Sequence, residues 1–157
     1  SKMFDSIQPS PEPVSLIRRL GVVLLPLLLT LSLLHPAVQA AGFESMGVEK
    51  ARAAALAGSL ILVDIRTPDE WKGSGLPDVA VALDMREKTF VQSLLALRKK
   101  NPGVKIGLIC ATGGRSRYVA NWLSRNGVSD IVDVAPGLHT SKTGWLAKQL
   151  PVRPPDK

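Results

Sequence analysis

Apolar and polar positions divide residues 41–157 into short apolar runs and longer helical segments. Nearly uninterrupted apolar runs are typical of strands buried on both faces of a sheet, and they occur at residues 60–65, 79–85, 104–109 and 131–134. Helix-forming stretches alternate with them, at residues 48–57, 89–97, 115–125 and 144–149. This alternation predicts an α/β fold, in which a doubly wound, mainly parallel sheet carries helices on both faces.

Local signals mark where several of these helices begin and end. A further short helix is expected after Thr67, with Thr67 as the N-cap, Pro68 as the first helical residue and Glu70 completing a capping box. Gly58 ends the first long helix, and the Asn-Pro-Gly sequence at residues 101–103 ends the next one.

The first 40 residues have the pattern of an export segment. An apolar run at residues 20–34 follows two arginines, and small residues in a Val-x-Ala pattern end at Ala40. This arrangement predicts a secretory signal over residues 1–40 that is cleaved after Ala40, and therefore an exported, periplasmic protein. The alternative is an uncleaved helix that attaches the chain to the membrane through residues 20–34, because the next charged residue is Glu44. In both cases residues 41–157 form a single domain.

The only cysteine of the chain, Cys110, comes directly after the apolar run 104–109. Parallel sheets bind ligands beyond the carboxyl ends of their strands, and Cys110 falls at such an end. The next predicted helix presents unpaired N–H groups and a dipole equivalent to about half a positive charge, which stabilise an anion. Gly113 and Gly114 permit a tight turn there, and Arg115 adds a full charge. We therefore expect a nucleophilic thiolate, rather than a buried inert cysteine or one paired between chains.

Four segments resemble the rhodanese family of sulfurtransferases and occur in the family's order. These segments are the run Asp64-x-Arg66-x-x-x-Glu70-Trp71, Leu76-Pro77 with the following run 81–85, the loop Cys110-x-x-Gly113-x-Arg115-Ser116 and the stretch 137–152. The loop is similar to the family's active loop, and the other three are similar to segments that flank it. The resemblance covers about residues 43–153 and implies one complete rhodanese-like domain.

The resemblance also implies a two-step sulfurtransferase reaction. The Cys110 thiolate would take the outer sulfur of a donor such as thiosulfate, become a persulfide, and pass that sulfur to a thiol or to cyanide. The implied substrate-binding residues follow the cysteine directly: Ala111, Thr112, Gly113, Gly114, Arg115 and Ser116. Asp64, Arg66 and Glu70 are expected to support the loop structurally, with Arg66 paired to an acidic neighbour.

The sequence departs from the family pattern at positions that bear on the donor. The stretch around Leu76 and Pro77 lacks the histidine that is common there, and Ala111 stands where the family often has arginine. Ser116 is explained equally well as a helix-capping residue. The identity of the sulfur donor is therefore open.

Two other functions fit parts of the same pattern. A persulfide carrier, or a partner-binding rhodanese module in a membrane-associated complex, would keep the fold without turnover. A cysteine phosphatase uses a C-x5-R loop, whereas four residues separate Cys110 from Arg115. A loop shorter by one residue suits a single sulfur atom better than a phosphate, so the sulfurtransferase is favoured.

Composition argues against several further classes. One cysteine and two histidines, His35 and His139, do not make a usual zinc site, so no metal is expected. No nucleotide- or cofactor-binding motif is visible, so no cofactor is expected. The net charge is +7 with only 4% aromatic residues, and basic residues without interleaved aromatics argue against a nucleic-acid partner. A positive surface favours small anionic substrates, as a sulfur donor such as thiosulfate would be.

Overall fold

The computed structural model describes residues 42–156 of the chain. The predicted export segment, residues 1–40, lies outside this range, together with its cleavage site. Between residues 42 and 156, no helix is both long enough and apolar enough to cross a membrane.

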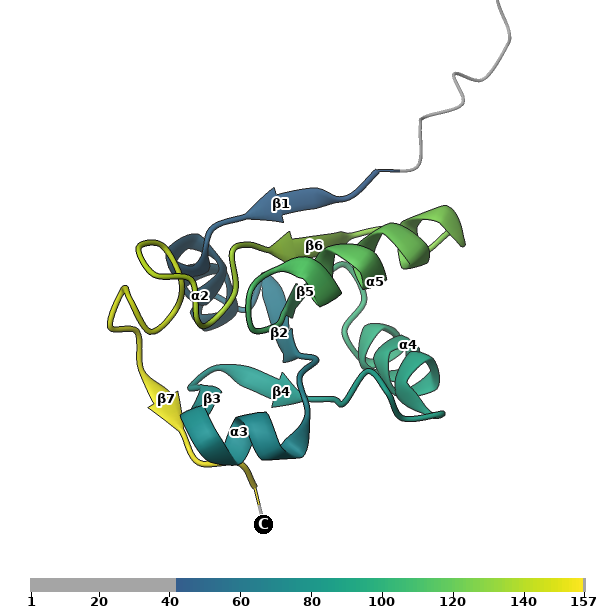
Figure 1. Cartoon of the computed structure of the whole chain (residues 1–157). Coiled ribbons are helices and arrows are strands. Elements are labelled where there is room, and N and C mark those ends of the chain that lie inside the picture. Colours follow the sequence, from purple (N-terminus) through teal and green to yellow (C-terminus); the bar gives the residue numbers. More distant parts are fainter. Residues whose placement is uncertain (1–41, 157) are drawn as a thin grey trace, which may run out of the picture. The chain divides into compact units, whose positions relative to one another are not determined.

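The centre of the fold is a five-stranded sheet in which all neighbouring strands run parallel (Figure 1). In spatial order the strands are β1 (Glu44–Met46), β6 (Ile131–Val134), β5 (Lys105–Ile109), β2 (Leu60–Asp64) and β4 (Ala80–Ala82). A separate antiparallel pair joins β3 (Leu76–Pro77) to β7 (Val152–Arg153). Because β5 is central and parallel to its neighbours, the residue after it lies at the sheet edge where such folds bind ligands.

Helices cover both faces of this sheet (Figure 1). These helices are α2 (Val48–Leu56), α4 (Phe90–Lys100) and α5 (Gly114–Arg125), and a shorter helix, α3 (Pro68–Ser74), follows β2. On one face, Ala51 of α2 shares a hydrophobic core with Leu62. On the other, Leu94 of α4 and Leu123 of α5 share a second core with Val63. Leu62 and Val63 are adjacent in β2 and enter opposite cores, as the two-residue period of a strand requires.

The predicted α/β fold with a parallel sheet covered on both faces is confirmed. The predicted start of α3 is confirmed as well, because Thr67 Oγ1 accepts the Glu70 N–H at 3.3 Å and Glu70 Oε2 accepts the Thr67 N–H at 3.0 Å. This reciprocal pair satisfies two N–H groups that a helix start leaves without partners.

Two predicted elements are wrong in extent or type. The strand expected over residues 79–85 is limited to Ala80–Ala82, because Asp84 bends the chain by accepting the N–H of Arg86 at 2.9 Å. The helix expected over residues 144–149 is a series of turns.

The reason for those turns is the burial of Trp145. Its side chain is 0% exposed and its Nε1–H donates to the Pro151 carbonyl at 2.9 Å. Its backbone N–H donates to the Gly137 carbonyl at 2.9 Å, an acceptor outside any helix. Tertiary contacts therefore override the local helical propensity of this segment.

Sequence patterns missed the three short strands β1, β3 and β7. They contain three, two and two residues, too few to show a period of hydrophobicity. Only their pairing with strands distant in sequence identifies them, such as β1 with β6 and β3 with β7.

A fully buried ion pair joins the end of β2 to α3. Arg66 Nη2 lies 2.7 Å from Asp64 Oδ2, and both side chains are 0% exposed. The same guanidinium donates to Ser74 Oγ and to the Gly75 carbonyl, each at 2.7 Å. The predicted pairing of Arg66 with an acidic neighbour is therefore present, and it positions α3 rather than touching the cysteine loop directly.

We predict that Arg66→Met destabilises the domain by about 3–5 kcal/mol, because it leaves the Asp64 carboxylate buried without a partner. Arg52→Met is the matched control. Arg52 and its partner Asp78 are about one-quarter exposed, at 27% and 26%, so its loss should cost about 1 kcal/mol or less. Urea unfolding at pH 7 measures both values, and equal losses would contradict the prediction.

Candidate active site

Cys110 lies immediately after β5, at the carboxyl edge of the sheet, and the chain then turns into α5 (Figure 1). Cys110 is 1% exposed, and its thiol forms no disulfide. The turn is short because Gly113, which precedes α5, has a φ of 93°, a left-handed conformation that favours glycine. The predicted position of the cysteine, between a strand end and a helix start, is therefore the observed one.

Two backbone N–H groups point at the sulfur. Gly113 donates to Cys110 Sγ at 3.1 Å and Ser116 donates to it at 3.4 Å. Gly113 is the N-cap of α5 and Ser116 lies in its first turn, so no carbonyl of the same helix accepts either N–H. The sulfur therefore lies at the positive end of the α5 dipole, where helix starts bind anions.

The segment after β6 holds the cysteine loop from behind. Leu138 N–H donates to the Cys110 carbonyl at 3.0 Å, and His139 N–H donates to the Ala111 carbonyl at 2.8 Å. Gly137 makes this approach possible, because a Cβ there would lie 2.6 Å from the Cys110 carbonyl oxygen. The loop is thus shaped by a segment about 27 residues further along the chain, counting Cys110 to Gly137.

Arg115 is paired with Glu70 of α3. Arg115 Nη2 lies 2.6 Å from Glu70 Oε1 and Nη1 lies 2.8 Å from Oε2. The hydrogen bonds from Arg115 are the largest cause that lowers the pKa of Glu70, to about 2, and burial opposes them. The same bonds raise the pKa of Arg115. The pair closes the loop against α3, so the charge of Arg115 is already engaged by this carboxylate.

The remaining predicted residues differ in exposure and in their relation to the cysteine loop. Thr112 and Gly114 are exposed at the mouth of the loop, and Ala111 is half-buried. Ser116 is fully buried, and it is the third residue of α5 rather than its cap. Asp64, Arg66 and Glu70 act on the loop from outside, the first two by fixing α3 and the third through Arg115.

Sequence reasoning missed one buried acid at this site. Ser116 Oγ donates to Asp133 Oδ1 at 2.7 Å, and Asp133 is 0% exposed on β6. The available signal was an acidic residue inside the apolar run 131–134, because a carboxylate in a buried strand requires a polar partner.

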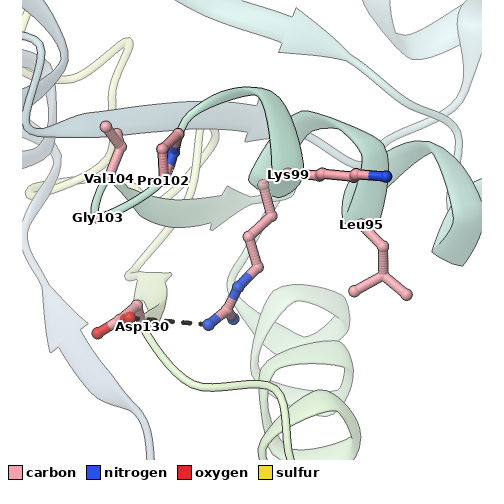
Figure 2. Close-up of a pocket in the computed structure, with 7 residues that line it drawn as sticks. Leu95, Lys99, Pro102, Gly103, Val104 and Asp130 are labelled. Carbon is pink, nitrogen blue, oxygen red and sulfur yellow. Dashed lines mark ion pairs between the residues drawn. The ribbon is translucent and has the colours of Figure 1, made fainter.

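A surface pocket of about 390 Å³ lies elsewhere (Figure 2). Its lining residues are Leu95, Arg98, Lys99, Pro102, Gly103, Val104 and Asp130. Arg98 Nη2 lies 3.7 Å from Asp130 Oδ2, and the dashed line that ends at Asp130 in Figure 2 marks this ion pair. The pocket adjoins the start of β5, whereas Cys110 follows its end, so it is not part of the cysteine site. Within residues 42–156 no cluster of three or more metal-ligating side chains is present.

A family model for the rhodanese-like domain matches residues 48–142, more than half of the chain. The chain belongs to the rhodanese-like domain family. The matched range includes the complete cysteine loop, Asp133 and the helix α3 that holds Glu70.

Two curated relatives illustrate the range of this similarity. The rhodanese-like domain is 27% identical over 104 residues to the uncharacterized protein RP600 of Rickettsia prowazekii, covering 61% of this chain and 85% of that one. It is 32% identical over 105 residues to the protein THYLAKOID RHODANESE-LIKE, chloroplastic, of Oryza sativa subsp. indica, covering 61% of this chain and 22% of that one. The chain thus spans most of the Rickettsia relative but less than a quarter of the rice protein.

Solved structures share the fold. The protein Rv0390 from M. tuberculosis superposes with a TM-score of 0.57 at 21% identity, covering 71% of this chain and 98% of that one. The polysulfide-sulfur transferase homodimer from Wolinella succinogenes superposes with a TM-score of 0.54 at 24% identity, covering 73% and 80%. At these identities the likeness establishes the rhodanese-like fold alone.

We predict that Glu70→Gln destabilises the rhodanese-like domain at pH 7 by about 1 kcal/mol, a value kept small because both partners are about one-third exposed. Glutamine preserves the capping box, so the change isolates the ion pair. Because the folded pKa of Glu70 is lowered to about 2, its contribution is complete above pH 4.5 and lost as the pH falls through about 2. Unfolding measured against pH should show the difference between the two proteins shrinking as the pH falls from 4.5 toward 2; a difference that stays constant over this range would contradict the assignment. Glu49→Gln, at a side chain that is 64% exposed, is the control.

We predict that Gly137→Ala destabilises the domain more than Gly127→Ala does. Both glycines have positive φ, 101° and 80°, so each substitution carries a backbone strain of about 1–2 kcal/mol. At Gly137 the new Cβ also meets the Cys110 and Ala111 carbonyl oxygens at 2.6 and 2.7 Å, whereas at Gly127 it meets nothing within 4 Å. Overpacking adds about 1–3 kcal/mol at Gly137 alone. Denaturant unfolding tests this difference. Equal losses of unfolding free energy in the two variants would contradict the prediction and mean that the cysteine loop moves to accommodate the new Cβ.

Proposed function

We propose that this domain is a sulfurtransferase that carries sulfane sulfur as a persulfide on Cys110. The observation that carries the proposal is the pair of backbone N–H groups, from Gly113 and Ser116, directed at a sulfur atom at the start of α5. Membership of the rhodanese-like family supports a sulfurtransferase-type activity.

The reaction has two transfers. In the first, the Cys110 thiolate attacks the outer sulfur of thiosulfate, the sulfur–sulfur bond of the donor breaks, and sulfite leaves with the bonding electrons. In the second, a thiol or cyanide attacks the outer sulfur of the persulfide, and Cys110 is released as the thiolate. Splitting the transfer through a covalent intermediate is the general advantage of nucleophilic catalysis.

The loop supplies the chemistry for the charged intermediate. The persulfide carries its negative charge on the outer sulfur, one bond beyond Sγ. The N–H groups of Gly113 and Ser116 and the positive end of the α5 dipole favour a negative charge at this place. The net charge of +7 favours the approach of a small anionic donor. Ala111 and the engagement of Arg115 by Glu70 leave fewer free charges at the mouth than an arginine-rich loop would offer. This arrangement also suits donors that are less highly charged than thiosulfate.

We propose in addition that the protein is exported to the periplasm by residues 1–40, or held at the membrane through residues 20–34. The apolar run, the two preceding arginines and the Val-x-Ala pattern support this proposal. The chain has no second cysteine that can resolve the persulfide as an internal disulfide, so its sulfur passes to an external acceptor.

Mass spectrometry after incubation with thiosulfate tests the function. We expect a mass gain of one sulfur atom on Cys110, its loss on addition of cyanide, and the production of thiocyanate over many turnovers. Cys110→Ser should abolish both signals. Thr112→Ala, at an exposed position beside the thiol, serves as a folded comparison for the loop.

The outcomes separate the candidate functions. A persulfide that forms once and is passed only to a protein or thiol acceptor identifies a carrier rather than a turnover enzyme. The absence of a persulfide with thiosulfate, inorganic polysulfide and an organic persulfide would refute the sulfurtransferase. Hydrolysis of a phosphate ester would instead favour the phosphatase.

A further inference from the structure

Asp133 is a buried carboxylate whose presence the fold alone does not explain. It lies in β6, between Val132 and Val134, which both enter one core, and it is 0% exposed. Its Oδ1 accepts the hydroxyl proton of Ser116 at 2.7 Å. Among the described residues, its Oδ2 has no hydrogen-bond partner, although Arg117 Nε lies 3.7 Å away. A carboxylate in such surroundings costs stability unless its charge is used or neutralised.

Ser116 joins this carboxylate to the cysteine. Cys110 Sγ lies 3.6 Å from Ser116 Oγ, in a geometry in which the thiol proton is donated to the hydroxyl oxygen. The hydroxyl has one proton, and its shortest contact is with Asp133, while the Gly113 carbonyl lies further away at 3.2 Å. When the serine donates to Asp133, its lone pairs are left to accept from the thiol. Thiol, hydroxyl and carboxylate therefore form a continuous path for one proton.

The other groups around Asp133 do not interrupt this path. Its register partners in the sheet are Ser45 on β1 and Leu108 on β5, and neither is charged. From α5 the charged group is Arg117, whose side chain is 68% exposed and forms a long contact. Near Cys110 the charged group is Arg115, which Glu70 already engages. Asp133 is therefore the buried base that the thiol reaches through a hydrogen-bonded hydroxyl.

We propose that Asp133 takes up the Cys110 thiol proton through Ser116 and stores it while the sulfur is charged. The Cys110 S–H bond breaks as the proton passes to Ser116 Oγ, and the serine proton passes to Asp133 Oδ1. The products are a thiolate, an intact hydroxyl and a neutral carboxylic acid. The proton returns by the same path when the thiolate is regenerated. The buried site thus holds one negative charge throughout, on Asp133 at rest and on sulfur during the reaction.

The use of this proton path in sulfur transfer rests on the proposed function, but the path itself is present in the protein without any substrate. Asp133 does not touch the sulfur and acts as a positioning residue through Ser116. The consequence is a weak dependence of thiol reactivity on pH. When Asp133 holds the proton, the thiolate forms without releasing a proton to water. We therefore expect the fraction of Cys110 that is thiolate to change little between pH 6 and 8.

The experiment is the rate of alkylation of Cys110 by iodoacetamide between pH 6 and 8, followed by mass spectrometry. This reagent needs no sulfur donor. We expect the unsubstituted domain to vary by less than about threefold over this range. Asp133→Asn keeps the shape of the side chain but accepts no proton. In this variant the alkylation rate should fall about tenfold for each unit by which the pH is lowered, because the thiol proton must then leave to water. Ser116→Ala should show the same slope, and the double variant should add nothing further.

Asp78→Asn is the matched control, because it neutralises a paired, partly buried carboxylate that is hydrogen-bonded to Arg52, far in sequence from the loop. Its alkylation profile should stay flat. Thermal unfolding of every variant identifies a change that reflects misfolding alone. If Asp133→Asn does not fold, Ser116→Ala is used for the test. If neither variant folds, the pH dependence of alkylation in the unsubstituted domain decides.

Three results would overturn the proposal. The first is a tenfold change per pH unit in the unsubstituted domain. The second is an Asp133→Asn profile parallel to it, which indicates a purely structural residue. The third is faster alkylation of Asp133→Asn at pH 6, which indicates that Asp133 only repels the thiolate. If the alkylation rate is independent of pH but the protein forms no persulfide from any donor, the proton path is supported and only the sulfurtransferase function is refuted.

Discussion

The start of α5 has backbone N–H groups that no carbonyl of its own helix can accept, and the sulfur of Cys110 accepts two of them, from the N-cap Gly113 and from Ser116. The rest of the site depends on this constraint. The N–H groups converge only if the loop between β5 and α5 stays short, and the loop stays short only if its backbone is held in a left-handed turn at Gly113. The burial of Leu108 and Ile109 in β5 and of Leu123 in α5 sets the two ends of that loop.

Two ion pairs of different character hold the loop from the side of β2. Asp64 and Arg66 are fully buried, and the guanidinium also binds the end of α3 through Ser74 and the Gly75 carbonyl. Glu70, on the same helix, then reaches Arg115 at the half-exposed surface. The buried pair is a structural constraint, because removing one partner leaves an uncompensated charge. The outer pair is weaker and exchangeable, because its two side chains are about one-third exposed.

Local patterns were sufficient where one segment decides its own conformation. The parallel strands, the capping box of Thr67 and Glu70, and the placement of Cys110 between a strand and a helix all follow from neighbouring residues. Predictions failed where distant residues decide. The segment 144–149 has helical composition, yet the burial of Trp145 holds it in turns. Strands β1 and β7 exist because partners far along the chain offer free backbone groups, and no two- or three-residue pattern reveals such a partner.

The sequence by itself determined the class of fold, the position of Cys110 after a strand and the residues of the loop that follows it, because periodicity, turn residues and a single cysteine are local properties. Only the tertiary structure decided which groups meet. It placed Glu70 rather than solvent beside Arg115, Gly137 against the Cys110 carbonyl, and Asp133 behind Ser116. These contacts join segments that lie 17 to 45 residues apart, and they arise from the order of strands in the sheet, which no local interaction encodes.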